Sequence, residues 1–111
     1  MAKFLTIGYG DREGYERTDP GVRDAAHAHD EQLRGQEGAT MGTAGTPVQV
    51  RNHDAAGVDT TSGPFMRSSL PVAGFALIEA ATIDEAVQLV SRSPCAVAQG
   101  VVEVWPLEQT P

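Results

Sequence analysis

Alternation of apolar and polar residues predicts several short strands along the chain. Residues 3–9 alternate in this way, and both faces of the strand carry apolar side chains, so both are expected to be covered at least in part. Val48 to Arg51 alternates as well, and Asp54-Ala55-Ala56-Gly57 supplies a turn from which residues 58–61 return as a hairpin partner. Further strands are predicted over 75–80 and 100–107, and the pattern also allows a short strand through Met41.

A first helix is predicted from Asp19-Pro20, where a capping side chain precedes a proline at the first helical position. The helix extends to about Gln36, and Gly38 follows as a stop signal. The intervening segment, Gly10 to Glu16, is polar and contains glycine, so it is predicted to be a loop. One face of the helix is formed by residues at helical spacing, namely Val22, Ala26, His29 and Leu33.

A second helix begins with the capping box Thr82-Ile83-Asp84-Glu85, and Pro94 is expected to end it. Its apolar stripe is predicted to contain Ile83, Ala86, Val87 and Val90, with Leu89 on the flank.

The predicted order β-α-β-β-β-α-β contains two similar β-α-β halves. This order indicates an α+β ferredoxin-like sandwich, in which an antiparallel sheet carries two helices on one face. The other face still presents Leu, Val and Trp side chains, and an uncovered apolar face usually marks an interface. Face-to-face dimerisation into an α+β barrel around a cavity is therefore predicted.

Composition supports one small domain spanning residues 1–111. The chain is 41% hydrophobic but only 5% aromatic, so the core is expected to be aliphatic. A core of this size is marginal alone, and burial in a homodimer would stabilise it.

Charge and cysteine content narrow the class of protein. A net charge of −7 argues against binding to nucleic acids or anionic membranes. Cys95 is the single cysteine, which excludes an intrachain disulfide and suits a reducing cytoplasm. No basic neighbour in sequence activates it, so a packed side chain is predicted. The apolar run after Met1 is too short for a signal peptide or a membrane span, so a cytoplasmic location is expected.

Short motifs distributed over nearly the whole chain resemble the YCII-related family, in its DGPF-domain branch. The matching segments are Phe4-Leu5-Thr6-Ile7-Gly8-Tyr9-Gly10, Arg23-Asp24-Ala25-Ala26-His27-Ala28-His29, Gly63-Pro64-Phe65, Gly74-Phe75-Ala76-Leu77-Ile78, Asp84-Glu85-Ala86 and Val102-Glu103-Val104-Trp105-Pro106. The resemblance implies a bacterial protein that forms a dimeric α+β barrel. A few relatives in the wider family are dehydrochlorinases or isomerase-like enzymes of aromatic degradation. The resemblance implies that such enzymes use a helix histidine with an acidic partner, in the pocket between sheet and helix.

Two departures from the family pattern bear on function. The family motif begins with aspartate, whereas Ser62 occupies that position here, which weakens any role of that aspartate in orienting a histidine. The register of the helix histidine is also ambiguous. Counting back from Gly38 favours His27, whereas the apolar stripe places His29 inward.

Candidate site residues follow from these patterns. His29 and His27 are the predicted acid-base residues, because histidine titrates near neutral pH. Tyr9 at the end of the first strand, Ser62 and Phe65 are the predicted substrate-binding residues. His53 belongs to a hairpin turn, and no motif or spacing predicts a metal or another cofactor.

Two functions of different classes remain open. The first is a small-molecule acid-base enzyme of isomerase, lyase or dehydrochlorinase type that uses a helix histidine. The alternative is a non-catalytic dimeric module that binds a small molecule or serves an accessory or regulatory role, for example as the partner of a transcription regulator. Loss of the motif acid at Ser62 favours the alternative.

Overall fold

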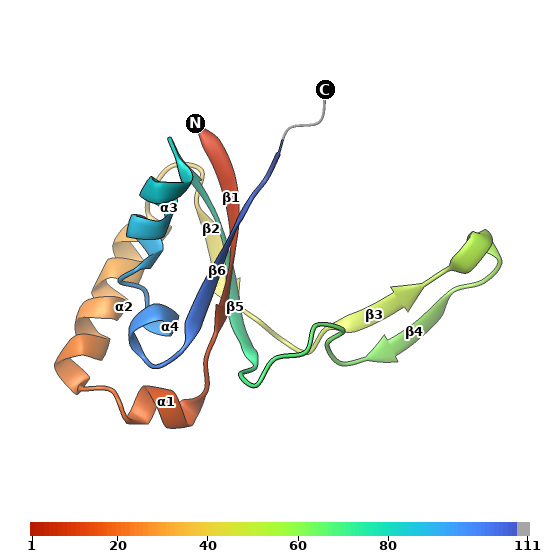
Figure 1. Ribbon diagram of the computed structural model, residues 1–111, viewed down its shortest axis with the longest axis horizontal. Helices are drawn as coiled ribbons and strands as arrows, with labels where there is room; N and C mark the ends of the chain where they lie inside the picture. The colour runs from red at the N-terminus through yellow and green to blue at the C-terminus, as the bar shows by residue number, and fades with distance from the viewer. Residues whose placement is uncertain (109–111) are drawn as a thin grey trace.

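The computed structural model describes residues 1–108 and has two parts, a layered α+β body and a projecting hairpin (Figure 1). The body contains a four-stranded antiparallel sheet in the order β2-β5-β1-β6. Its strands are β1 (Ala2–Tyr9), β2 (Thr40–Thr43), β5 (Val72–Ala80) and β6 (Val101–Pro106). The helices are α1 (Arg12–Glu16), α2 (Pro20–Arg34), α3 (Ile83–Val90) and α4 (Pro94–Val97).

The helices cover one face of this sheet (Figure 1). The chain crosses from β1 through α2 to β2, and from β5 through α3 to β6. Each crossover passes over one strand of the sheet, because β5 lies between β1 and β2, and β1 lies between β5 and β6. The predicted α+β class, with an antiparallel sheet and helices on one face, is therefore confirmed.

The hairpin forms a separate two-stranded sheet of β3 (Val48–Arg51) and β4 (Asp59–Ser62). We call residues 47–63 the arm, because they extend away from the body (Figure 1). A short 3-10 helix, η1 (His53–Ala55), forms its tip, where Asp54 and Ala55 adopt positive φ angles. The hairpin was predicted correctly, but its expected place in the main sheet was wrong.

Two helical segments were missed from the sequence. The segment predicted as a loop contains α1, whose first turn is capped by Asp11, with the Gly14 backbone N–H donating to its carboxylate at 2.8 Å. Thr18 then donates its hydroxyl to the Gly14 carbonyl at 2.9 Å. Pro94 ends no helical region, since it is the first residue of α4.

The capping box that begins α3 is present. The Glu85 backbone N–H donates to the Thr82 hydroxyl at 3.1 Å, and the Glu85 carboxylate reaches back to the Ala81 backbone N–H at 3.2 Å. Two residues of each helix are buried as predicted, Ala26 and Leu33 in α2 and Ala86 and Val90 in α3. Of the other residues of the predicted stripes, Val22, Ile83 and Val87 are exposed. His29 and the flanking Leu89 are half-buried.

The hydrophobic core lies between the sheet and helices α2 and α3. It contains large side chains from both layers, such as Phe4, Ile78 and Leu33, and alanines that allow close packing. Because side chains alternate along β1, the neighbours of Phe4 point to the opposite face of the sheet.

That opposite face, which we call the open face, is largely apolar. Leu5 pairs there with Leu77 on one side and Trp105 on the other, and Ile7 pairs with Phe75. Phe75 is 43% exposed and Trp105 is 51% exposed, because no helix covers them.

Candidate functional site

A cavity of about 390 Å³ lies between the helices and the covered face of the sheet. Helix α2 contributes Leu33 to its lining, β5 contributes Ala76, and α4 contributes Cys95. Gly8 of β1 also lines it, and a Cβ atom there would lie 2.9 Å from the Cys95 Sγ. The space therefore depends on small residues in the central strands.

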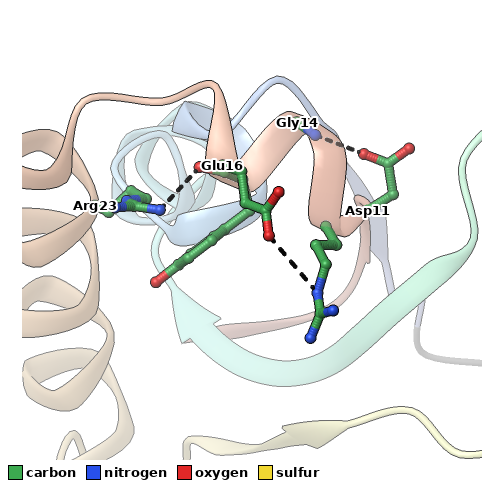
Figure 2. Close-up of polar contacts among 6 residues, drawn as sticks. Asp11, Gly14, Glu16 and Arg23 are labelled. Atoms are coloured by element: carbon green, nitrogen blue, oxygen red, sulfur yellow. Dashed lines mark hydrogen bonds and ion pairs between the residues drawn. The ribbon is translucent and has the colours of Figure 1, made fainter.

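His27 lines this cavity and is hydrogen bonded to the hydroxyl of Tyr15, with 2.7 Å between the Tyr15 Oη and the His27 Nε2. The donor depends on the tautomer of the imidazole, so this pair can carry a proton in either direction. Tyr15 is held by Arg23, whose guanidinium lies 4.7 Å from the ring centroid and donates to the Tyr15 carbonyl at 3.3 Å. Figure 2 shows Arg23 extending from α2 toward α1.

Asp30 lines the same cavity one helical turn after His27. Burial raises the pKa of its carboxyl above the ordinary value. Electrostatic interactions lower this pKa, most strongly with Arg34 and then with His27 and His29, but burial has the larger effect. The raised pKa favours the protonated form, in which a carboxyl can donate as well as accept a hydrogen bond. Asp30 is thus the carboxyl group of this cavity best suited to proton transfer.

Cys95 faces the same space but is not an activated nucleophile. Burial raises the pKa of its thiol, and the negative charge of Asp30 raises it further. The half-buried side chain packs close to Gly8 of β1, which agrees with the predicted packed cysteine.

His29 occupies a different environment from His27. Its Nε2 donates to the backbone carbonyl of Leu89 at 2.5 Å, which ties α2 to the end of α3. This carbonyl is one of the last in α3 and benefits from a donor. The structure therefore places His27 beside the cavity, whereas His29 makes an interhelical contact.

Two of the three predicted substrate-binding residues lie on the other side of the main sheet. Tyr9 and Phe65 line a groove of about 730 Å³ between the open face and the base of the arm. The Tyr9 hydroxyl donates to the Glu103 carboxylate at 2.5 Å, and this bond, followed by burial, raises the pKa of Tyr9. Phe65 is 75% exposed, with the Arg51 guanidinium 5.8 Å from its ring centroid.

Ser62 is exposed on β4 and lines neither the groove nor the cavity. Within one copy of the chain, Tyr9 and Phe65 are therefore separated by the main sheet from His27, and Ser62 lies on the arm. The position where the family motif has aspartate also lies away from Asp30.

Asp30 and Tyr15 were missed as candidate site residues. His27 and Asp30 are three positions apart, a spacing that puts two side chains on the same helix face, so this pair was detectable in the sequence. Tyr15 gave no such signal, because its position depends on α1 and on the contact with Arg23. Within residues 1–108, no group of three or more His, Cys, Asp or Glu side chains is arranged to hold a metal ion.

Comparison of the chain with protein-family models and with curated proteins gives no match. The resemblance to the YCII-related family therefore remains a prediction from the motifs. Across residues 1–108, no helix combines the length and the apolar character that crossing a membrane requires.

Proposed function

We propose that this protein is a YCII-like small-molecule enzyme whose cavity binds a small, mainly apolar organic molecule and transfers a proton on it. The observation that carries the proposal is the placement of His27 and Asp30 on the lining of one cavity. A histidine together with a carboxyl group whose own pKa is raised is a common acid-base combination. The reaction belongs to the isomerase, lyase or dehydrochlorinase type.

In the proposed reaction, the neutral imidazole of His27 removes a proton from a carbon atom next to a carbonyl group of the ligand. The Tyr15 hydroxyl orients that imidazole through the bond at 2.7 Å. In the fraction of molecules in which Asp30 is protonated, a fraction that its raised pKa increases, the carboxyl donates to the ligand oxygen on which charge develops, or returns a proton to a second carbon atom.

Incorporation of deuterium tests this reaction even when the product is unidentified. Small cyclic and aromatic carbonyl compounds would first be screened for binding by ligand-observed NMR. The bound compounds would then be incubated with the protein in D₂O, and loss of a C–H signal would report proton removal. We expect His27→Gln and Asp30→Asn to abolish the exchange, and His53→Gln, at the exposed tip of the arm, to preserve it.

The alternative function, a non-catalytic binding module, is favoured by one observation. The hydrogen bonds of residues 1–108 include none between His27 and Asp30, and the Nε2 of His27 is engaged by Tyr15. Binding to the cavity without deuterium exchange in any ligand would support this alternative and contradict the enzyme.

The proposal includes a homodimer formed through the open face. Exposed Phe75 and Trp105 support it, because an uncovered sheet face that carries large apolar side chains usually marks an interface. Trp105→Arg is expected to shift the mass measured by light scattering from dimer to monomer, whereas Val87→Arg on the exposed side of α3 would not. A monomeric mass for the unmodified protein would contradict the dimer.

A further inference from the structure

The molecule exposes more surface than a compact chain of its size. Its accessible surface is 7716 Å², which is about 1,800 Å² more than the roughly 5,900 Å² expected for a compact monomer of this mass. Its radius of gyration is 16.0 Å, compared with about 13 Å for a compact domain of this length. The arm, which extends away from the body, accounts for the elongated shape (Figure 1).

The arm lacks a second layer. A hairpin of two strands is marginally stable in water unless further strands or a packed layer cover it. The cross-strand register of the arm places Val48 opposite Ser62 and Val50 opposite Thr60, so these four side chains share one face. We call it the valine face. It carries no charged group, and all four of its residues are exposed.

Other exposed apolar side chains gather on the same side of the molecule. Phe75 and Trp105 belong to the open face, and Phe65 follows the end of the arm. Val48, Val50, Phe65 and Phe75 all line the groove of about 730 Å³. The groove is therefore an apolar recess in the angle between the arm and the open face.

The charged groups of the open face have partners within that face. Lys3 lies opposite Glu79 on the neighbouring strand, an arrangement in which opposite charges attract. Glu103 accepts the hydrogen bond from the Tyr9 hydroxyl. An uncharged valine face and an open face with paired charges suit an apolar partner surface, which is typical of contacts between copies of one chain.

The amount and the shape of the extra surface fit a second copy. Permanent homodimers bury about 2,000–5,000 Å² in total, or about 1,000–2,500 Å² per copy, and the excess of about 1,800 Å² lies within this range. A two-fold interface uses the same surface of both copies, so that surface needs a projection and a recess. The arm is such a projection, and the groove beside it is such a recess (Figure 1).

We infer that the arm is a dimerisation arm, and that a second copy of this chain lies in the angle between the arm and the open face. Each copy then covers the valine face of the other together with its open face. This inference rests on the proposed function, which includes a homodimer formed through the open face. It goes beyond that proposal because it makes the arm part of the interface.

Substitutions on the two faces of the arm test the inference. Val48→Glu and Val50→Glu would place a charge on the valine face, and each should raise the dimer Kd at least about tenfold. Sedimentation velocity over a series of protein concentrations measures this Kd. Thr61→Glu is the matched control, because Thr61 pairs with Gln49 on the opposite face, is exposed and does not line the groove. It should leave the Kd unchanged.

A milder pair of substitutions keeps the test valid if the glutamate variants do not fold. Val48→Thr combined with Val50→Thr preserves the branched shape and the strand propensity and adds only hydroxyl groups. This variant should raise the dimer Kd severalfold, and circular dichroism would verify that it is folded. At concentrations well below the Kd, where the copies are separate, the arm substitutions should leave the free energy of unfolding nearly unchanged.

Hydrogen exchange measures the covering of the arm directly. Amide protons of β3 and β4 should be protected in the unmodified dimer and should exchange much faster in the monomeric Trp105→Arg variant. Amide protons of β1, at the centre of the main sheet, should remain protected in both proteins. Equal protection of the arm in dimer and monomer would overturn the inference.

The remaining results separate this inference from the proposed function. A dimer that is disrupted by Trp105→Arg but unaffected by the valine-face variants would overturn the inference and leave the homodimer intact. Equal weakening by Val50→Glu and Thr61→Glu would also overturn it, since the effect would then come from charge alone. A monomeric unmodified protein would overturn both the inference and the homodimer, while deuterium exchange in a cavity ligand would still support the enzyme.

Discussion

The body and the arm are built from similar strand patterns but differ in what covers them. In the body, Phe4 and Ile78 lie under α2 and α3 and are buried. In the arm, Val48 and Val50 alternate with polar residues in the same way, yet Val50 is 66% exposed. An apolar alternation is therefore sufficient to form a strand, whereas burial requires a second layer.

The same difference separates the two hollows of the molecule. The cavity lies between the helices and the sheet, and burial raises the pKa values of the Asp30 carboxyl and the Cys95 thiol on its lining. The groove lies between the open face and the arm, and its aromatic Phe65 is exposed. The carboxyl and thiol with raised pKa values thus lie under the helices. The side of the arm has the Tyr9 hydroxyl, whose pKa is also raised, and the exposed apolar surface.

The largest expected difference between the body and the arm is in how much a large-to-small substitution lowers stability. Ile78→Ala removes a side chain that is 1% exposed and should lower the free energy of unfolding by about 2–5 kcal/mol. Val50→Ala on the arm should change it by no more than about 0.5 kcal/mol. Urea denaturation followed by circular dichroism measures both, and equal losses would show that the arm is part of the same core.

A smaller difference in stability is expected between glycine-to-alanine substitutions in the body and in the arm. Gly8→Ala would place a Cβ atom 2.9 Å from the Cys95 Sγ and should cost about 1–3 kcal/mol through overpacking. Gly57→Ala in the arm meets no atom within 4 Å and should be nearly neutral. Adding Cys95→Ala to Gly8→Ala should recover part of the loss, because it removes the opposing sulfur. The absence of any coupling in this double-mutant cycle would contradict the close contact.

The smallest effect concerns pH and Asp30. Since the pKa of its carboxyl is raised in the folded state, its favourable contribution to stability is present below the unfolded pKa and is lost as pH rises through the folded pKa. Asp30→Asn should therefore be more stable than the unmodified protein at neutral pH, and the advantage should shrink as pH falls toward the ordinary range of aspartate. Thermal denaturation at several pH values measures this difference.

Exposed Asp59 on the arm is the control for this titration. Asp59→Asn should show no comparable change with pH. An Asp30→Asn variant that is less stable at neutral pH would show that Arg34 and the histidines outweigh burial, and would weaken the case for Asp30 as a proton donor.

Local signals in the sequence determined much of the body. The cap at Asp19-Pro20 and the box at Thr82 define where α2 and α3 begin, since both signals act within one helical turn. Alternation likewise located β1, β3 and β6 to within about two residues. The i, i+3 spacing of His27 and Asp30 was present in the sequence, whereas the apolar stripe pointed to His29.

Tertiary structure decided the features that bear on function. It packed α1 against α2 so that Tyr15 meets His27, and it paired His29 with the carbonyl of Leu89. It also left the arm outside the main sheet and separated Phe65 from the cavity. None of these outcomes follows from local periodicity, because each depends on which distant segment occupies the neighbouring space.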